Sequence, residues 1–355
     1  MKISIVGPAH PYRGGLAVIM QSMARVFQHR GDEVKIKTFT LQYPRIFFPG
    51  RNQTVQTPPP PDLYIVRCVN TMNPFNWIAV GRWIAREKPD FVLMKYWTPF
   101  MAPCFGTIAR FAKKNGTTRI LCQIDNVEPH ERHMTDKPFN RYFLRAVDGF
   151  IYMSEQVHRE LRRYTQVPAL FSPHPLFENF GIVIDRTEAC IRLELDPSKR
   201  YALFFGLIRD YKGLDLLLDA WKIYKREQIA DNGLEDDVIL HDYFIPDELV
   251  RYYFSVADFL VQPYRSATQS GVTQIAYQFD LPMVVTDVGG LPEIVPDGRV
   301  GFVCRPDAAE VARAIDRIWR DDVLAGFRAN MEEEKKRFSW DAMCDRITEL
   351  YRLVK

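Results

Sequence analysis

The stretch Tyr201-Ala-Leu-Phe-Phe-Gly-Leu-Ile-Arg-Asp-Tyr-Lys-Gly213 begins as an apolar run and places Arg209 and Lys212 three residues apart. The apolar run predicts a buried strand with both cations just beyond its end. Gln269-Ser-Gly-Val-Thr273 starts a new apolar-periodic segment and predicts a helix N-terminus. Two cations beside free backbone amides suit a diphosphate. Because the spacing of NTPase phosphate loops is absent, we expect this anion to be held rather than hydrolysed.

Length and composition set the broad class. The chain has 355 residues, 47% apolar and 26% charged, with a net charge of +3. This length suits two domains of ~100–200 residues each. Basic residues prevail in residues 1–177 and acidic residues in 178–355, so the halves could attract each other across a cleft, and the basic half could contact an anionic membrane or substrate. No nucleic-acid motif accompanies the basic residues, so nucleic acid is not an expected partner.

The cysteines and the apolar runs indicate a compartment. Six cysteines lie far apart without a Cys-x-x-Cys pair, which favours reduced thiols over a disulfide framework or a zinc site. Met1–Gly7 lacks the apolar region of a signal peptide, and no run of ~18 apolar residues follows. We expect a cytoplasmic protein. Peripheral contact with the inner membrane face stays open, through the loop Tyr43–Gly50 or through an amphipathic helix within 100–114 that could equally pack on its own sheet.

Strands, loops and helices alternate along the chain, which predicts parallel, doubly wound sheets. A proline-rich stretch, Val167–Pro175, is typical of a hinge. We therefore expect an N-terminal Rossmann-like domain at 1–175, a C-terminal one at 176–338, and a last helix at 339–355 that can pack back on the first. Expected strands cover 3–6, 34–39, 91–94, 120–122, 149–152, 201–206, 237–241, 258–261 and 283–288; expected helices begin near 16, 75, 100, 138, 213, 246, 270 and 339.

Several stretches together resemble one known family. They are Gly206–Gly213, Ala257–Tyr264 and Leu281–Val295, supported by Gly14-Gly15 and Asp125–Glu131. In order and spacing they resemble the retaining GT-B glycosyltransferases of family 4, also called glycosyl transferases group 1. The resemblance implies two Rossmann-like domains facing across a cleft. It also implies transfer of a sugar from a nucleotide-diphosphate sugar, with retained configuration and without a metal or other cofactor. We expect a glycan or lipid-linked acceptor in surface polysaccharide synthesis.

The resemblance assigns the donor mainly to the second domain. Lys212 matches the lysine that contacts the donor diphosphate, and Arg209 is the second cation. Placed in advance, both would stabilise the charge that develops on the leaving phosphate oxygen. Backbone amides at the helix start and close approach at a Gly-Gly turn would complete the site. The candidate donor-binding residues are Gly14, Gly15, Arg209, Lys212, Ser270, Gly271, Val272, Thr273 and Glu293.

The candidate catalytic residues follow the expected strand at 120–122. Many members of the family place a histidine there, whereas this chain has Asp125 or Asn126, with His130 shortly after. Any of the three could contact sugar hydroxyls or stabilise an oxocarbenium-like centre. A metal site from Glu128, His130, Glu131 and His133 is not expected, because their spacing would not point all four inward.

The chain departs from the family in two places. Two family glutamates, eight positions apart, align with Ala267 and Ile275, so Gln269 or Gln274 would have to supply the hydrogen bonds. The segment 219–238 is too short for a further strand and helix, so we expect one helix and a sheet one strand short. These departures keep two alternatives open: a catalytically inactive GT-B module that binds nucleotide or a partner protein, and a GT-B sugar-nucleotide epimerase, which fits the motif order less well.

Overall fold

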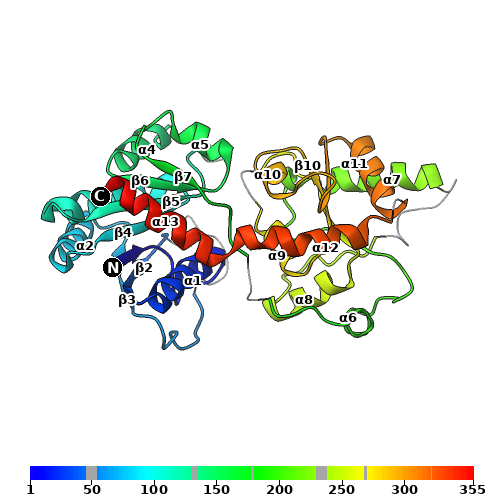
Figure 1. Ribbon diagram of the computed structural model, residues 1–355, viewed down its shortest axis with the longest axis horizontal. Helices are drawn as coiled ribbons and strands as arrows, with labels where there is room; N and C mark the ends of the chain where they lie inside the picture. Colours follow the sequence, from blue (N-terminus) through cyan, green and yellow to red (C-terminus); the bar gives the residue numbers. More distant parts are fainter. Residues whose placement is uncertain (45–53, 129–133, 177–179, 229–237, 268–269, 321) are drawn as a thin grey trace. The chain divides into compact units, whose positions relative to one another are not determined.

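The computed structural model describes residues 1–44, 54–128, 134–176, 180–228, 238–267, 270–320 and 322–355. They form two compact units (Figure 1). The first comprises Met1–Pro173 and Trp340–Lys355, and the second comprises His174–Ser339. The units thus divide two residues before the boundary expected from the sequence. Each unit is an α/β structure with a parallel sheet, which confirms the expected fold class.

The first unit is built on a seven-stranded parallel sheet in the order β3-β2-β1-β4-β5-β6-β7. The order reverses between β1 and β4, where the carboxyl ends of strands usually form a binding site. The strands are β1 Lys2–Val6, β2 Glu33–Leu41, β3 Ile65–Asn70, β4 Phe91–Tyr96, β5 Arg119–Ile124, β6 Gly149–Tyr152 and β7 Ala169–Phe171.

Two of these strands differ from the expectation. β3 was not expected, and β7 lies inside the stretch Val167–Pro175 that was interpreted as a hinge. The hinge interpretation is wrong for residues 169–171, because prolines are tolerated next to an edge strand. The carbonyl of Pro168 accepts a hydrogen bond from the amide of Phe150 and so extends the pairing of β6 with β7.

Helices cover both faces of this sheet (Figure 1). On one face α1 and α13 share a hydrophobic core with the sheet, in which Phe27 and Ile347 are fully buried. A Cβ added to Gly149 would lie 2.8 Å from Leu350, so α13 approaches β6 closely. A second core covers the other face. The helices are α1 Gly15–His29, α2 Pro74–Glu87, α3 Ala102–Ala112, α4 Asp136–Leu144, α5 Glu155–Leu161 and α13 Trp340–Val354, with 3-10 turns η2 Pro99–Met101 and η3 Lys113–Asn115.

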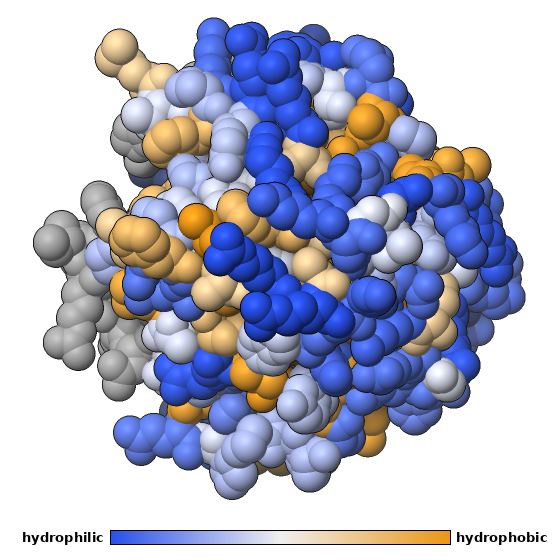
Figure 2. All heavy atoms as spheres, turned by 90° about the vertical axis from the view of Figure 1, so that its left-hand side faces the viewer, coloured by the Kyte–Doolittle hydropathy of each residue, from blue (hydrophilic) through white to orange (hydrophobic). Residues whose placement is uncertain are grey.

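Two segments were candidates for membrane contact, the helix within 100–114 and the loop Tyr43–Gly50. In α3 the side chains of Phe105 and Ile108 are fully buried, so this helix packs on its own sheet rather than on a membrane. Residues 45–50 of the alternative loop lie outside the described part of the chain. The face drawn in Figure 2 is mostly hydrophilic, with hydrophobic residues in separate small groups. None of the helices within the described ranges is long and apolar enough to span a bilayer.

The second unit contains a four-stranded parallel sheet in the order β11-β10-β9-β8. Its strands are β8 Ala202–Leu203, β9 Phe259–Gln262, β10 Met283–Thr286 and β11 Gly301–Cys304. Its helices are α6 Arg186–Leu193, α7 Leu214–Gln228, α8 Asp247–Val256, α9 Gly271–Gln278, α10 Leu291–Ile294, α11 Ala308–Arg320 and α12 Leu324–Lys335, with 3-10 turns η4 Asp210–Lys212 and η5 Lys336–Phe338. β11 was not expected from the sequence.

The strand expected at 237–241 is absent from the described residues 238–241, which form no regular structure. Val238, Ile239 and Leu240 are instead exposed. An apolar triplet becomes a buried strand only where a neighbouring strand can pair with it, and among the described residues β8 pairs with β9 alone. The single helix expected after Gly213 is α7, and residues 229–237 lie outside the described ranges.

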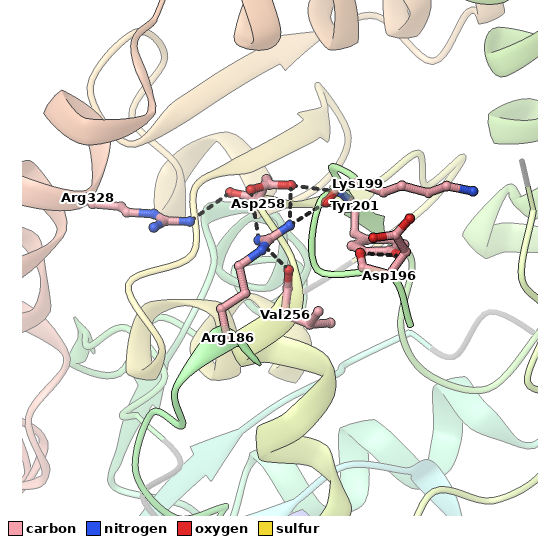
Figure 3. A network of polar contacts seen from close by, with 7 residues as sticks. All are labelled: Arg186, Asp196, Lys199, Tyr201, Val256, Asp258 and Arg328. Carbon is pink, nitrogen blue, oxygen red and sulfur yellow. Dashed lines mark hydrogen bonds and ion pairs between the residues drawn. The ribbon is translucent and has the colours of Figure 1, made fainter. Parts of the chain in front are cut away.

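A polar network joins β8 to its neighbour β9 (Figure 3). The Asp258 carboxylate accepts hydrogen bonds from the Tyr201 amide at 2.7 Å and from the Arg186 guanidinium at 3.1 Å. Arg186 also donates to the carbonyls of Val256 and Lys199, each at 2.7 Å. Because Tyr201 directly precedes β8, which leads toward the Arg209–Lys212 loop, this network holds the start of that strand in place.

Candidate phosphate site and catalytic edge

Two glycines shape the loop after β8. Gly206 has φ +107° and Gly213 has φ +67°, both in the left-handed region that favours glycine. A Cβ on Gly213 would lie 2.1 Å from the Pro263 carbonyl oxygen, so the loop backbone packs directly on the segment after β9. The amide of Arg265 also donates to the Tyr211 carbonyl at 2.7 Å. The loop is therefore held against the carboxyl end of the sheet.

Lys212 turns back over this loop. A Cβ on Gly206 would lie 2.6 Å from the Lys212 ammonium and 3.7 Å from a methyl group of Val272 in α9. The ammonium also lies 5.7 Å from the centre of the Tyr264 ring. Burial lowers the pKa of Lys212, and the nearby charge of Arg209 lowers it further. Within the described ranges, neither cation forms an ion pair with a carboxylate.

The first turn of α9 lies beside this ammonium. Ser270 caps the helix, and its hydroxyl accepts from the Val272 amide at 3.3 Å and from the Gln262 side chain at 2.7 Å. The Thr273 hydroxyl donates to the Ser270 carbonyl at 2.5 Å. Both hydroxyls are thus engaged within the protein. The backbone amides of the first turn other than that of Val272, with Gly271 exposed, remain as the groups that suit an anion.

The positions of the missing family glutamates are apolar and buried, since Ala267 is 5% exposed and Ile275 6% exposed. Gln274 is also fully buried, and neither atom of its amide has a partner among the described residues. Gln269 lies outside the described part of the chain. Glu293 lies on α10 after β10, and its carbonyl accepts from Arg337 at 3.1 Å; no contact joins it to Lys212 within the described ranges.

In the first unit, Gly14 and Gly15 begin α1. Gly14 precedes the helix without a side-chain cap, and a Cβ built on it would meet no atom within 4 Å. The N-terminus of a 15-residue helix therefore borders open space. Free amides and the positive end of the helix dipole suit an anion or a polar sugar group at this point.

Asp125 follows β5 and is held by a residue that the sequence reasoning missed. The ammonium of Lys95, on the neighbouring strand β4, donates to the Asp125 carboxylate at 2.5 Å. Lys95 is fully buried, whereas the Asp125 side chain is 19% exposed. The sequence contained one indication of this pair, a lysine inside the apolar strand Phe91–Tyr96. Because a lysine is rarely buried unless it is paired, its position predicts a carboxylate partner nearby. The ion pair presents one partly exposed carboxylate at the carboxyl edge of the sheet.

The other two catalytic candidates stand differently. Asn126 is half-buried, and its side-chain oxygen has no hydrogen-bond partner among the described residues. His130 lies outside the described residues, as do Glu131 and His133. The structure thus brings Arg209, Lys212 and the start of α9 together in the second unit. In the first unit, Gly14 lies after β1 and Asp125 directly follows β5. Strand β4, which carries Lys95, lies between these two strands in the sheet.

Two family models match most of the chain. A family model described as "Glycosyltransferase Family 4" matches residues 13–170, and one described as "Glycosyl transferases group 1" matches residues 199–321. A D-inositol 3-phosphate glycosyltransferase from Streptomyces bingchenggensis is 25% identical over 78% of this chain and 64% of its own length. A lipopolysaccharide core biosynthesis mannosyltransferase from Rhizobium meliloti is 26% identical over 60% of this chain and 68% of its own length. The chain thus spans about two thirds of these relatives.

Solved structures share the fold over nearly the whole chain. Sucrose-phosphate synthase from Thermosynechococcus elongatus superposes with a TM-score of 0.74 at 18% identity, covering 99% of this chain and 98% of that one. The Anabaena protein HepE, solved with UDP and glucose, has a TM-score of 0.69 at 15% identity, covering 98% of both chains. The two family matches and the shared architecture show that the chain belongs to the GT-B glycosyltransferases.

Proposed function

We propose that the protein is a retaining, metal-independent hexosyltransferase that moves a sugar from a nucleotide-diphosphate sugar to a glycan or lipid-linked acceptor. The observation that carries this proposal is the pair Arg209 and Lys212, two cations without a carboxylate partner in the described ranges, beside the amides of α9. A diphosphate would supply the missing negative charge.

The electrostatics of this pair suit a leaving group. Burial and the charge of Arg209 lower the pKa of Lys212, so the unliganded site holds its positive charge at a cost. An anion between the two cations would remove that cost, and most strongly when charge develops on the phosphate oxygen as the glycosidic bond breaks. In this proposal the protein's own cations take the place of a metal, and no cofactor is needed.

We infer that Asp125 contacts the transferred sugar. Its carboxylate is oriented by the buried Lys95 and is partly exposed at the carboxyl edge of the sheet. There it could accept hydrogen bonds from sugar hydroxyls or stabilise positive charge at the anomeric centre. Asn126 and His130 remain further candidates for the same role. The UDP and glucose in the Anabaena structure support a nucleotide-sugar donor.

The acceptor class is inferred from the relatives. The Rhizobium relative is a mannosyltransferase of lipopolysaccharide core biosynthesis, which supports surface polysaccharide synthesis as the setting. All six cysteines are free, which supports a cytoplasmic location. A peripheral position at the inner membrane face would bring the protein to a lipid-linked acceptor.

A second candidate is an inactive GT-B module that binds a nucleotide or a partner protein. The buried apolar Ala267 and Ile275 favour it, because they cannot replace the donor contacts of the family glutamates. The retained cations oppose it. The two functions differ in turnover, because the inactive module would bind a nucleoside diphosphate but would not turn over any donor.

The test is hydrolysis or transfer across a panel of nucleotide sugars, with Lys212→Ala compared with Lys222→Ala. Lys222 is an exposed lysine of α7 in the same unit and serves as the matched control. We expect Lys212→Ala alone to abolish turnover while the fold, followed by circular dichroism, stays intact. Equal turnover in both variants would contradict the proposed role, and nucleotide binding without turnover by the wild type would establish the inactive module.

A further inference from the structure

The first unit contains a second concentration of positive charge, separate from the donor cations. It is a cavity of about 670 Å³ between α3, α4 and the segments next to α5. Among the described residues, five cationic side chains and one carboxylate line it, together with two tyrosines. The lining residues are Arg110, Glu128, Lys137, Pro138, Arg141, Tyr142, Arg145, Arg163 and Tyr164. We call it the cationic pocket.

Three of the cations follow one face of α4 and its C-cap residue. Lys137, Arg141 and Arg145 follow one another at intervals of four residues, so they stack along that face. All three are exposed, and none forms an ion pair with a carboxylate in the described part of the chain. Like charges at this spacing repel one another and destabilise the helix. A bound anion would turn this repulsion into attraction.

A fourth cation, Arg110 of α3, is fixed in place. Its guanidinium donates to the carbonyls of Gly106 at 2.8 Å and Tyr142 at 2.6 Å and lies 3.9 Å from the centre of the Tyr142 ring. A Cβ on Gly106 would lie 2.6 Å from that ring, so α3 and α4 meet without a gap. This wall of the pocket is therefore built in advance rather than assembled by mobile side chains.

The one carboxylate among the described lining residues is already engaged. Glu128 accepts from Arg163 at 3.0 Å, and its backbone amide donates to Glu160 at 3.2 Å. The pocket keeps a large excess of positive charge after this pair is counted. Guanidinium groups bind the oxygens of phosphate in a bidentate manner, and the hydroxyl of Tyr164 can donate a further hydrogen bond. The Tyr142 hydroxyl already shares a hydrogen bond of 2.9 Å with the Thr107 hydroxyl.

We propose that the cationic pocket binds a multiply charged phosphate group, either a phosphomonoester or a diphosphate. This chemistry has two sources, the headgroup of an anionic lipid and a soluble phosphorylated compound. The inference goes beyond the proposed function, because the pocket lies wholly in the first unit and shares no residue with Arg209 and Lys212. The two proposals can therefore fail independently.

The first experiment is titration calorimetry with inorganic pyrophosphate. It uses the Arg209→Gln/Lys212→Met protein, so that the donor cations do not contribute. In that background Arg141→Gln/Arg145→Gln is compared with Arg86→Gln/Arg352→Gln, which removes two exposed arginines of the same unit outside the pocket. We expect the pocket variant to lose at least tenfold in pyrophosphate affinity and the control variant to keep it. Equal affinities in the two variants would overturn the proposal.

The second experiment separates the two sources. Wild type, pocket variant and control variant are sedimented with phosphatidylcholine vesicles, with and without phosphatidic acid. Loss of binding to phosphatidic acid in the pocket variant alone supports a lipid headgroup. Equal vesicle binding in all three proteins, with pyrophosphate affinity lost only in the pocket variant, supports a soluble phosphate. If neither vesicle binding nor pyrophosphate binding differs between the pocket variant and the control variant, the result contradicts both a lipid headgroup and a soluble phosphate as the ligand of the cationic pocket.

Discussion

The ammonium of Lys212 lies 2.6 Å from the point where a side chain at Gly206 would begin. Glycine at 206 therefore permits this position of the Lys212 ammonium, since a Cβ at 206 would displace the lysine from over the loop. With φ +107°, the position also disfavours any other residue.

Gly206→Ala tests this relationship. The new methyl group should displace Lys212 from the start of α9 and lower nucleoside diphosphate affinity by about 10-fold or more, as expected for the loss of a charge-assisted hydrogen bond of ~1.5–3 kcal/mol. Titration calorimetry measures the change. Gly326→Ala is the control, because a Cβ on that glycine would meet no atom within 4 Å. Unchanged affinity in Gly206→Ala would show that the Lys212 position is not needed.

A pH dependence follows from Lys212. Burial and the charge of Arg209 lower its pKa below the usual 10.5 in the folded protein. Between the lowered pKa and 10.5 the unfolded chain binds more protons, so stability of the unliganded protein should rise with pH in that window. Lys212→Met should lack this rise and should be at least as stable as the wild type at pH 7 without ligand. Thermal unfolding across pH checks both, and a wild-type profile parallel to that of the variant would contradict the expectation.

Removing Asp125 from the Lys95–Asp125 ion pair should lower stability more than removing Lys95. Asp125→Asn leaves a fully buried ammonium without its counter-charge, which costs ~3–5 kcal/mol of stability. Lys95→Met leaves a carboxylate that is partly exposed and should cost less. Denaturant unfolding of the two single variants and of Lys95→Met/Asp125→Asn measures this. We expect the double variant to be more stable than Asp125→Asn alone; additive losses would show that the two residues are not coupled.

The network at Asp258 predicts a loss of stability in the second unit. Asp258→Asn replaces a charged acceptor shared by Tyr201 and Arg186 and should cost ~1–3 kcal/mol. Asp219→Asn, at a carboxylate that is 62% exposed, should change stability little. Chemical unfolding of the two variants checks the difference. Equal stability of the two variants would mean that the hydrogen bonds to Asp258 do not stabilise the start of β8.

The grouping of Arg209 and Lys212 near the start of α9 could be predicted from the sequence because its signals are local. Arg209 and Lys212 follow one strand within a single loop, and the Ser270 cap directly precedes the apolar periodicity of α9. The alternation of strands and helices likewise predicted the parallel sheets. Short edge strands were harder: β7, three residues among prolines, carries no pattern that distinguishes it from a loop.

Other features could not be predicted because they depend on contacts between residues that are distant in the sequence. Lys95 and Asp125 are thirty residues apart and meet only because β4 and β5 are neighbours in the sheet. Arg110 and Arg141 come from different helices, so the cationic pocket was not visible along the chain. The strand expected at 237–241 was wrong for residues 238–241, because apolar residues form a strand only where the sheet offers a partner.

In the proposed function, Arg209 and Lys212 hold the diphosphate of a donor nucleotide. Titration calorimetry of the wild type and of Arg209→Gln/Lys212→Met against a panel of nucleoside diphosphates tests this role. We predict one binding site for at least one nucleotide in the wild type and a loss of at least 100-fold in affinity in the double variant. Equal affinity of both proteins for the same nucleotide would show that these two cations do not bind the donor diphosphate.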